Sequence, residues 1–99
     1  MFDENSNMIV VCSISEDNNS IVKIELLDDN RSLFSRQCEQ NNFCEQLPSM
    51  INDVLFFLKK KFNKNCNDKI EYKIDFDIKK HLTTYRIFNS FVAGFVSNT

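Results

Sequence analysis

The segment at residues 45–62, EQLPSMINDVLFFLKKKF, constrains the fold more than any other, because its apolar residues recur at helical spacing. The central stripe consists of Leu47, Ile51, Val54, Leu58 and Phe62. Met50, Leu55 and Phe57 widen the stripe to about 160° of the circumference, at about 100° per residue. Phe56 points out of the opposite side. A helix on a single sheet needs an apolar face of only about 100°, so the pattern predicts that this helix contacts a second surface.

Three segments before this helix are typical of β-strands. Residues 8–14, MIVVCSI, form a nearly continuous apolar run, which suits a strand buried on both faces. Residues 20–27 alternate apolar and charged side chains, and residues 32–38 are more polar, as expected of an edge strand. The turn-forming stretches EDNN and DDNR separate the three segments. Together they predict an antiparallel meander of three strands.

The second half of the chain predicts one more strand and one more helix. Residues 69–78, KIEYKIDFDI, alternate strictly, so one face of this strand is buried and the other faces water. Residues 82–96 carry a broad apolar face at helical spacing and predict a helix, with a β-hairpin as the alternative. The predicted order is β-β-β-α-β-α in one α/β domain, a mixed sheet with two helices on one side. We expect residues 1–7 to be disordered.

Composition argues against a cofactor, metal or nucleotide site. The 99 residues include one glycine and one proline, whereas a phosphate-cradling loop needs glycines that let the backbone approach closely. The four cysteines show no C-x-x-C spacing, and His81 is the only histidine, so no zinc pattern is present. We therefore predict no cofactor, no metal and no small-molecule substrate.

Residues with catalytic potential are scattered along the chain. No local signature pairs His81 with a cysteine nucleophile. Asp75 and Asp77 fall on the water-facing side of the fourth strand, and the first strand carries no acid that a two-metal nuclease would require. We predict no catalytic residue, and at most a non-catalytic subunit of an enzyme complex.

The N-terminus and the apolar runs bear on localisation. The opening MFDENSNMIV is acidic where a secretory leader would be basic, and no apolar run approaches the ~20 residues of a membrane span. We expect a cytoplasmic protein whose thiols stay reduced, with no membrane partner.

The predicted order of elements resembles the opening half of the ribonuclease-H-like layout, the actin-like (ASKHA) lobe shared by actin, sugar kinases and the large heat-shock chaperones. Within it, the stretch SRQCEQNNFCEQLPSMINDVL resembles the loop and Leu-Pro-initiated helix of the bacterial TsaB family, with Leu47-Pro48 and Met50 in step. The stretch IKKHLTTYRIF is similar to the family's Gly-Pro-Gly-Ser-Phe-Thr-Gly-Leu-Arg-Ile-Gly segment, with Thr83, Arg86 and Ile87 matching.

The likeness spans about residues 8–96 and matches only the N-terminal half of the family. It departs from the family at Ser13, which replaces an aspartate. The glycines of the Gly-Pro-Gly segment are also replaced, by Ile78, Lys80, Thr84 and Phe88. The resemblance implies a divergent, truncated TsaB-like domain over residues 1–99.

TsaB is the non-catalytic partner of TsaD in making threonylcarbamoyladenosine on tRNA, and it pairs with TsaD through the two helices of this half. The resemblance therefore implies a heterodimer with a TsaD-like protein, in which tRNA is contacted only indirectly. The side chains expected at this partner interface are Met50, Val54, Phe56, Phe57, Ile87, Phe88, Phe91 and Phe95. The alternative is a small homodimeric binding module that contacts RNA or another acidic partner through Lys59, Lys60, Lys61 and Lys64.

Overall fold

The computed structural model describes residues 8–15, 17, 21–62 and 70–97. Its elements are β1 (Met8–Ile14), β2 (Ile21–Asp28), β3 (Arg31–Glu39), the 3₁₀ turn η1 (Gln40–Asn42), α1 (Phe43–Phe62), β4 (Glu71–Asp75) and α2 (Leu82–Ser97). This order confirms the predicted β-β-β-α-β-α series, and α2 is a helix rather than the alternative hairpin. The disorder predicted for residues 1–7 falls outside the described residues.

The four strands form one mixed sheet in the order β3-β2-β1-β4. The first three strands pair antiparallel, as the meander prediction requires, and β4 lies parallel to β1. The loop between β2 and β3 consists of Asp29 and Asn30, with φ values of 51° and 69°. Positive φ at both loop positions characterises a type I′ hairpin turn, and Asp and Asn tolerate that conformation. This tight loop fixes β3 at one edge of the sheet, and β4 forms the other edge.

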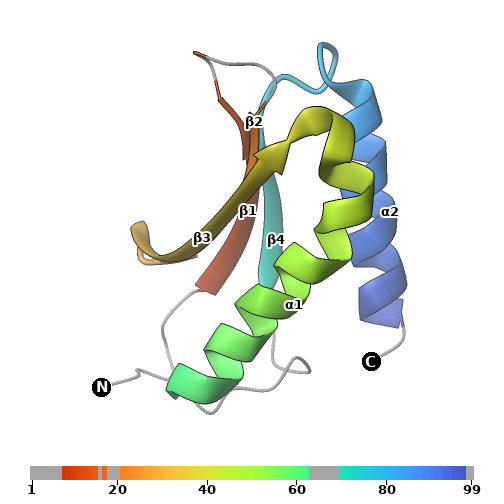
Figure 1. Ribbon diagram of the computed structural model, residues 1–99. Coiled ribbons are helices and arrows are strands. Elements are labelled where there is room, and N and C mark those ends of the chain that lie inside the picture. The colour runs from red at the N-terminus through yellow and green to blue at the C-terminus, as the bar shows by residue number, and fades with distance from the viewer. Residues whose placement is uncertain (1–7, 16, 18–20, 63–69, 98–99) are drawn as a thin grey trace.

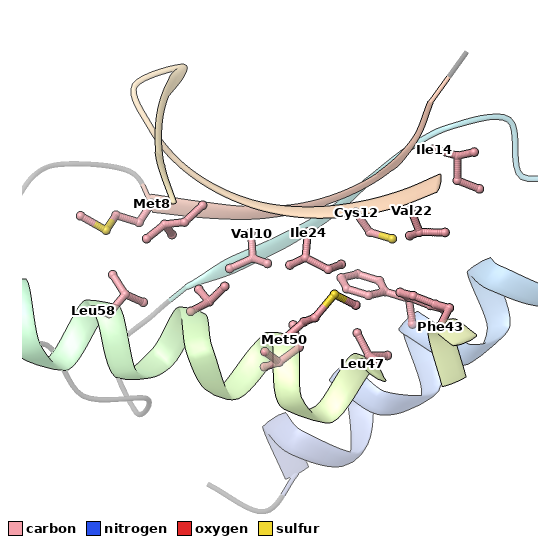
Figure 2. Packing of buried hydrophobic residues seen from close by; sticks show 14 residues of the cluster. Met8, Val10, Cys12, Ile14, Val22, Ile24, Phe43, Leu47, Met50 and Leu58 are labelled. Carbon is pink, nitrogen blue, oxygen red and sulfur yellow. The ribbon is translucent and has the colours of Figure 1, made fainter. Parts of the chain in front are cut away.

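Both helices lie on the same face of the sheet, as predicted (Figure 1). The alternation of β2 turns Val22, Ile24 and Leu26 toward the helices, and each side chain is 0% exposed. Figure 2 shows this layer of strand side chains above those of α1. The core cluster comprises Met8, Val10, Cys12, Ile14, Val22, Ile24, Leu26, Phe43, Leu47, Met50, Ile51, Val54, Leu58 and Phe88. Burial of each large aliphatic side chain contributes about 1.5–3 kcal/mol, so this layer is the main source of stability.

The opposite face of the sheet is covered by neither of the two helices. Val11 on this face is 8% exposed, while Ile9 and Ser13 beside it are half-buried. The prediction that the first strand is buried on both faces therefore holds fully only for the helix-covered side. Val11 is shielded because it is central in the sheet, between Glu25 of β2 and Lys73 of β4.

The first helix begins earlier than the sequence pattern predicted. α1 starts at Phe43, directly after η1, so Pro48 lies in its second turn. Proline has no N–H to donate to the carbonyl four residues earlier, which belongs to Cys44. Because Cys44 is exposed, water can solvate that carbonyl, and the helix continues through the proline.

The fourth strand is shorter than the alternating pattern from residue 69 to 78. β4 ends at Asp75, because the chain then turns into α2. The Asp77 carboxylate accepts a hydrogen bond from the backbone N–H of Lys79 at 3.1 Å, and the Asp77 carbonyl accepts one from the N–H of His81, also at 3.1 Å. These bonds form the turn that leads into α2.

α1 has 20 residues and α2 has 16. Within the described part of the chain, neither helix combines the length and the apolar character that crossing a bilayer demands.

Candidate partner interface

α1 and α2 lie side by side on the sheet and begin close to each other (Figure 1). The side-chain amide of Gln40 in η1 donates to the hydroxyl of Thr84 at 3.0 Å, and Thr84 is 2% exposed. This bond links the start of α1 to the first turn of α2. The two helices therefore form one layer on the sheet, and they are linked where they begin.

Three of the side chains predicted at the partner interface are enclosed in the domain itself. Met50, Val54 and Phe88 are 2%, 0% and 2% exposed, and all three belong to the core cluster. The ring of Phe88 packs edge-on against Tyr72 of β4, with centroids 6.5 Å apart. For these three residues the prediction is wrong. The apolar arc of α1 is largely covered by the sheet, whereas among the described side chains of α2 only Thr84 and Phe88 are buried.

Two other predicted interface residues remain accessible on α2. Ile87 and Phe91 are half-buried and pack against the edge of the core cluster. Helical spacing places them on the same flank as Thr84, which faces the start of α1. Leu55 of α1 is also half-buried, and it lies on the flank of α1 opposite Phe57. We call Leu55, Ile87 and Phe91 the helix seam.

Phe56 and Phe57 lie on the other side of α1, next to β3. The ring of Phe57 packs against that of Phe34, with centroids 5.1 Å apart and planes inclined by 31°. Phe56 is 65% exposed, and the Lys60 ammonium lies 5.5 Å from its ring centroid. These rings line a groove of about 250 Å³, whose lining residues are Phe34, Arg36, Asp53, Phe56, Phe57, Lys60 and Lys61. We call it the β3 groove.

The sequence prediction missed the contribution of β3 to this groove. The sequence pattern marks β3 only as a polar edge strand, so it does not indicate a role for Phe34 or Arg36. The available signal was the spacing of two between Phe34 and Arg36, which places both side chains on one face of the strand.

Lys59, Lys60 and Lys61 are all exposed in the last turn of α1. Cations at this end of a helix complement the partial negative charge of its free carbonyl groups. The side chain of Phe95 and all of Lys64 lie outside the described residues, so those two predictions stay open.

Asp75 ends β4, and Asp77 and His81 lie in the segment that leads from β4 into α2. Asp75 and Asp77 are exposed, whereas His81 is half-buried with its ring edge-on to Phe76, at 5.9 Å between centroids and 89° between planes. Across the described residues, His, Cys, Asp and Glu form no group of three that could hold a metal ion.

The cysteines differ in environment. Cys12 is fully buried, and burial, with a smaller contribution from Cys38, raises its pKa to about 12. Burial and the nearby Glu39 also raise the pKa of Cys38, which is half-buried. A raised pKa keeps a thiol protonated, and the thiol is a much weaker nucleophile than the thiolate. Cys44 is exposed, and Cys66 lies outside the described residues.

The structure therefore presents two candidate contact surfaces, the helix seam and the β3 groove. No protein-family model, no curated protein and no solved structure matches this chain.

Proposed function

We propose that the chain is a non-catalytic, TsaB-like scaffold subunit that pairs through α1 and α2 with a TsaD-like partner in tRNA threonylcarbamoyladenosine modification. The observation that carries the proposal is the layer of two adjacent helices on one face of the sheet, with the helix seam only half-buried at its outer surface. A second pair of helices from a partner would complete a four-helix bundle and cover Leu55, Ile87 and Phe91. In this proposal tRNA contacts the partner, and the complex works in the cytoplasm.

The mixed four-strand sheet with both helices on one side agrees with the ribonuclease-H-like lobe that the sequence resemblance implies. The loss of the family's glycines is compatible with a scaffold role, because a subunit that binds no nucleotide needs no close approach of backbone to phosphate.

The outer surface of α2 suits close helix packing. Ser90, Ala93 and Gly94 are exposed and small. A Cβ atom added at Gly94 meets nothing within 4 Å, so this position faces open space. Small side chains allow two helix axes to approach toward the short end of the usual 8–10 Å range.

The test is co-expression of the chain with a TsaD-like protein, followed by measurement of the size of the complex. Gly94→Arg places a long cation on the outer surface of α2, and Ser35→Arg adds the same group on the helix-free face of the sheet as the matched control. We expect the wild type and Ser35→Arg to form a 1:1 complex and Gly94→Arg to remain a monomer. Absence of the wild-type complex, or equal assembly of both variants, would overturn the proposal.

The response to salt provides a second readout. Because the proposed contact is apolar, the complex should persist from about 50 mM to 500 mM salt. Charge-driven association would weaken steeply over this range.

A further inference from the structure

We propose that the β3 groove binds an extended acidic peptide segment of a partner protein, which adds to the free edge of β3 as a further strand. This surface lies on the β3 side of α1, away from the helix seam. The inference therefore does not depend on the TsaB-like assignment.

The first argument is the free edge. β3 ends the sheet on one side, and within the described residues it pairs only with β2. It is nine residues long, which leaves a row of backbone N–H and C=O groups facing outward. An added peptide strand is the usual way in which such an edge is used for recognition.

The second argument is the aromatic pocket beside this edge. Phe34 of β3 and Phe57 of α1 form its packed floor, with ring centroids 5.1 Å apart. Phe56 forms an exposed wall, with 65% of its surface accessible. Such a pocket can take one bulky apolar side chain from a strand laid along β3. Exposed aromatic side chains of this kind are typical anchors of protein interfaces.

The third argument is the positive charge of the groove lining, which favours an acidic segment as the bound peptide. The chain as a whole has a net charge of −2, yet the groove lining carries Arg36, Lys60 and Lys61 against the single carboxylate of Asp53. Arg36 and Asp53 pair at 3.3 Å, so the two lysines give the groove its excess positive charge. An acidic segment complements this charge, and the complementarity would also speed its association.

A second copy of the chain fits this surface less well. A two-fold pairing of β3 edges brings the same surface of both copies together, so two basic grooves would share one interface. Like charges placed in this way repel. RNA would also be attracted by the lysines, but the backbone groups of the β3 edge match another peptide backbone rather than a nucleotide. The Lys60 ammonium, 5.5 Å from the ring centroid of Phe56, also competes with a base for stacking on one face of that ring.

The test uses three fluorescent probes with the full chain: the acidic peptide EVDFDVE, the basic peptide KVKFKVK and a 12-nucleotide oligouridine. Three variants go with them. Phe56→Ala removes the exposed wall, Lys61→Glu reverses a charge in the groove, and Lys59→Glu is the matched control, because Lys59 lies next to the same cluster but does not line the groove.

We expect the acidic peptide to bind with a Kd below about 1 mM. The affinity should fall about tenfold or more in Phe56→Ala and in Lys61→Glu, and should stay within about twofold in Lys59→Glu. Methylation of the peptide's backbone nitrogens should abolish binding, because it removes the donors that pair with the β3 edge. Gly94→Arg should leave peptide binding unchanged, which separates this result from that of the helix seam.

Several outcomes would overturn the proposal. These are equal binding of the acidic and basic peptides, equal effects of Lys59→Glu and Lys61→Glu, or unchanged binding after methylation. Binding of oligouridine in place of the acidic peptide would assign the groove to RNA. A concentration-dependent dimer that Phe56→Ala abolishes, without peptide binding, would assign it to a second copy.

Discussion

At the scale of single residues, the burial of each cysteine side chain decides how readily its thiol can react. Cys12 points into the core and Cys38 lies half-buried on the edge strand, while Cys44 is exposed at the start of α1. The three thiols therefore form an order of accessibility that follows from their positions in the fold.

In a Cys66→Ser background, we expect a thiol reagent at pH 8 to label Cys44 at once, Cys38 slowly and Cys12 only after unfolding. The raised pKa of Cys12, about 12, leaves very little thiolate at pH 8, and burial excludes the reagent. Peptide mass mapping of the labelled protein measures this order. Labelling of Cys12 as fast as Cys44 in the native protein would contradict the structure.

The raised pKa of Cys12 also makes the stability of the protein depend on pH. In the unfolded chain Cys12 loses its proton near its ordinary pKa of 9.0, whereas in the folded protein it keeps the proton to about pH 12. The folded state therefore binds more protons between these values, and the free energy of unfolding falls as pH rises through this range. Denaturant titrations from pH 8 to 11 check this, and Cys12→Ala should reduce the slope of the decline.

Gly94 provides a residue-scale prediction about α2. Because the added methyl group meets open space, Gly94→Ala should raise the free energy of unfolding of the isolated chain by about 0.5–1 kcal/mol, through the higher helix propensity of alanine. Ala93→Gly, one position earlier on the same exposed surface, should lower it by a similar amount. Urea denaturation measures both, and a destabilising Gly94→Ala would show that the position is not open.

At the scale of elements, α1 divides into a side that faces the sheet and a side that faces solvent. Met50→Ala should cost about 2–5 kcal/mol of stability, because the side chain is 2% exposed in the core cluster. Phe56→Ala should cost less than about 1 kcal/mol, because its ring is mostly in water. Denaturant unfolding of the two variants distinguishes them, and similar losses would contradict the assigned orientation of α1.

The elements were largely predictable from sequence, because periodicity reports which side of a strand or helix is apolar. The alternation of Val22, Ile24 and Leu26 specified the buried face of β2. The sequence pattern also identified the broad apolar arcs of both helices, but it did not identify the surfaces that cover them. Periodicity measures the width of an apolar face without showing how many neighbours share it, so Met50, Val54 and Phe88 were assigned to a partner although the chain itself covers them.

Two features, the course of α1 through Pro48 and the β3 groove, could not be predicted from the periodicity of the sequence. Helix continuation through Pro48 leaves the Cys44 carbonyl without its intrahelical N–H donor, and the groove depends on contacts between residues far apart in the chain, Phe34 and Phe57. Neither spatial relation is expressed as a local repeat.

At the scale of the whole molecule, the two layers give the domain surfaces of different character. The helix seam is apolar, the β3 groove is aromatic and basic, and the helix-free sheet face is mixed. Because the first two surfaces lie on opposite flanks of α1, variants at Gly94 and Lys61 should act independently. In the double variant Gly94→Arg/Lys61→Glu, the loss of binding to the TsaD-like partner should equal that of Gly94→Arg alone. The loss of binding to the acidic peptide should equal that of Lys61→Glu alone.

The parallel pairing of β4 with β1 has a consequence for the order in which the chain opens. β4 is only five residues long, lies at the edge of the sheet and is separated from β1 in sequence by β2, β3 and α1. Its attachment is thus the most non-local contact of the sheet, whereas β1, β2 and β3 are joined through neighbouring segments. In deuterated water, amide protons of β4 should be replaced before those at the centre of β2.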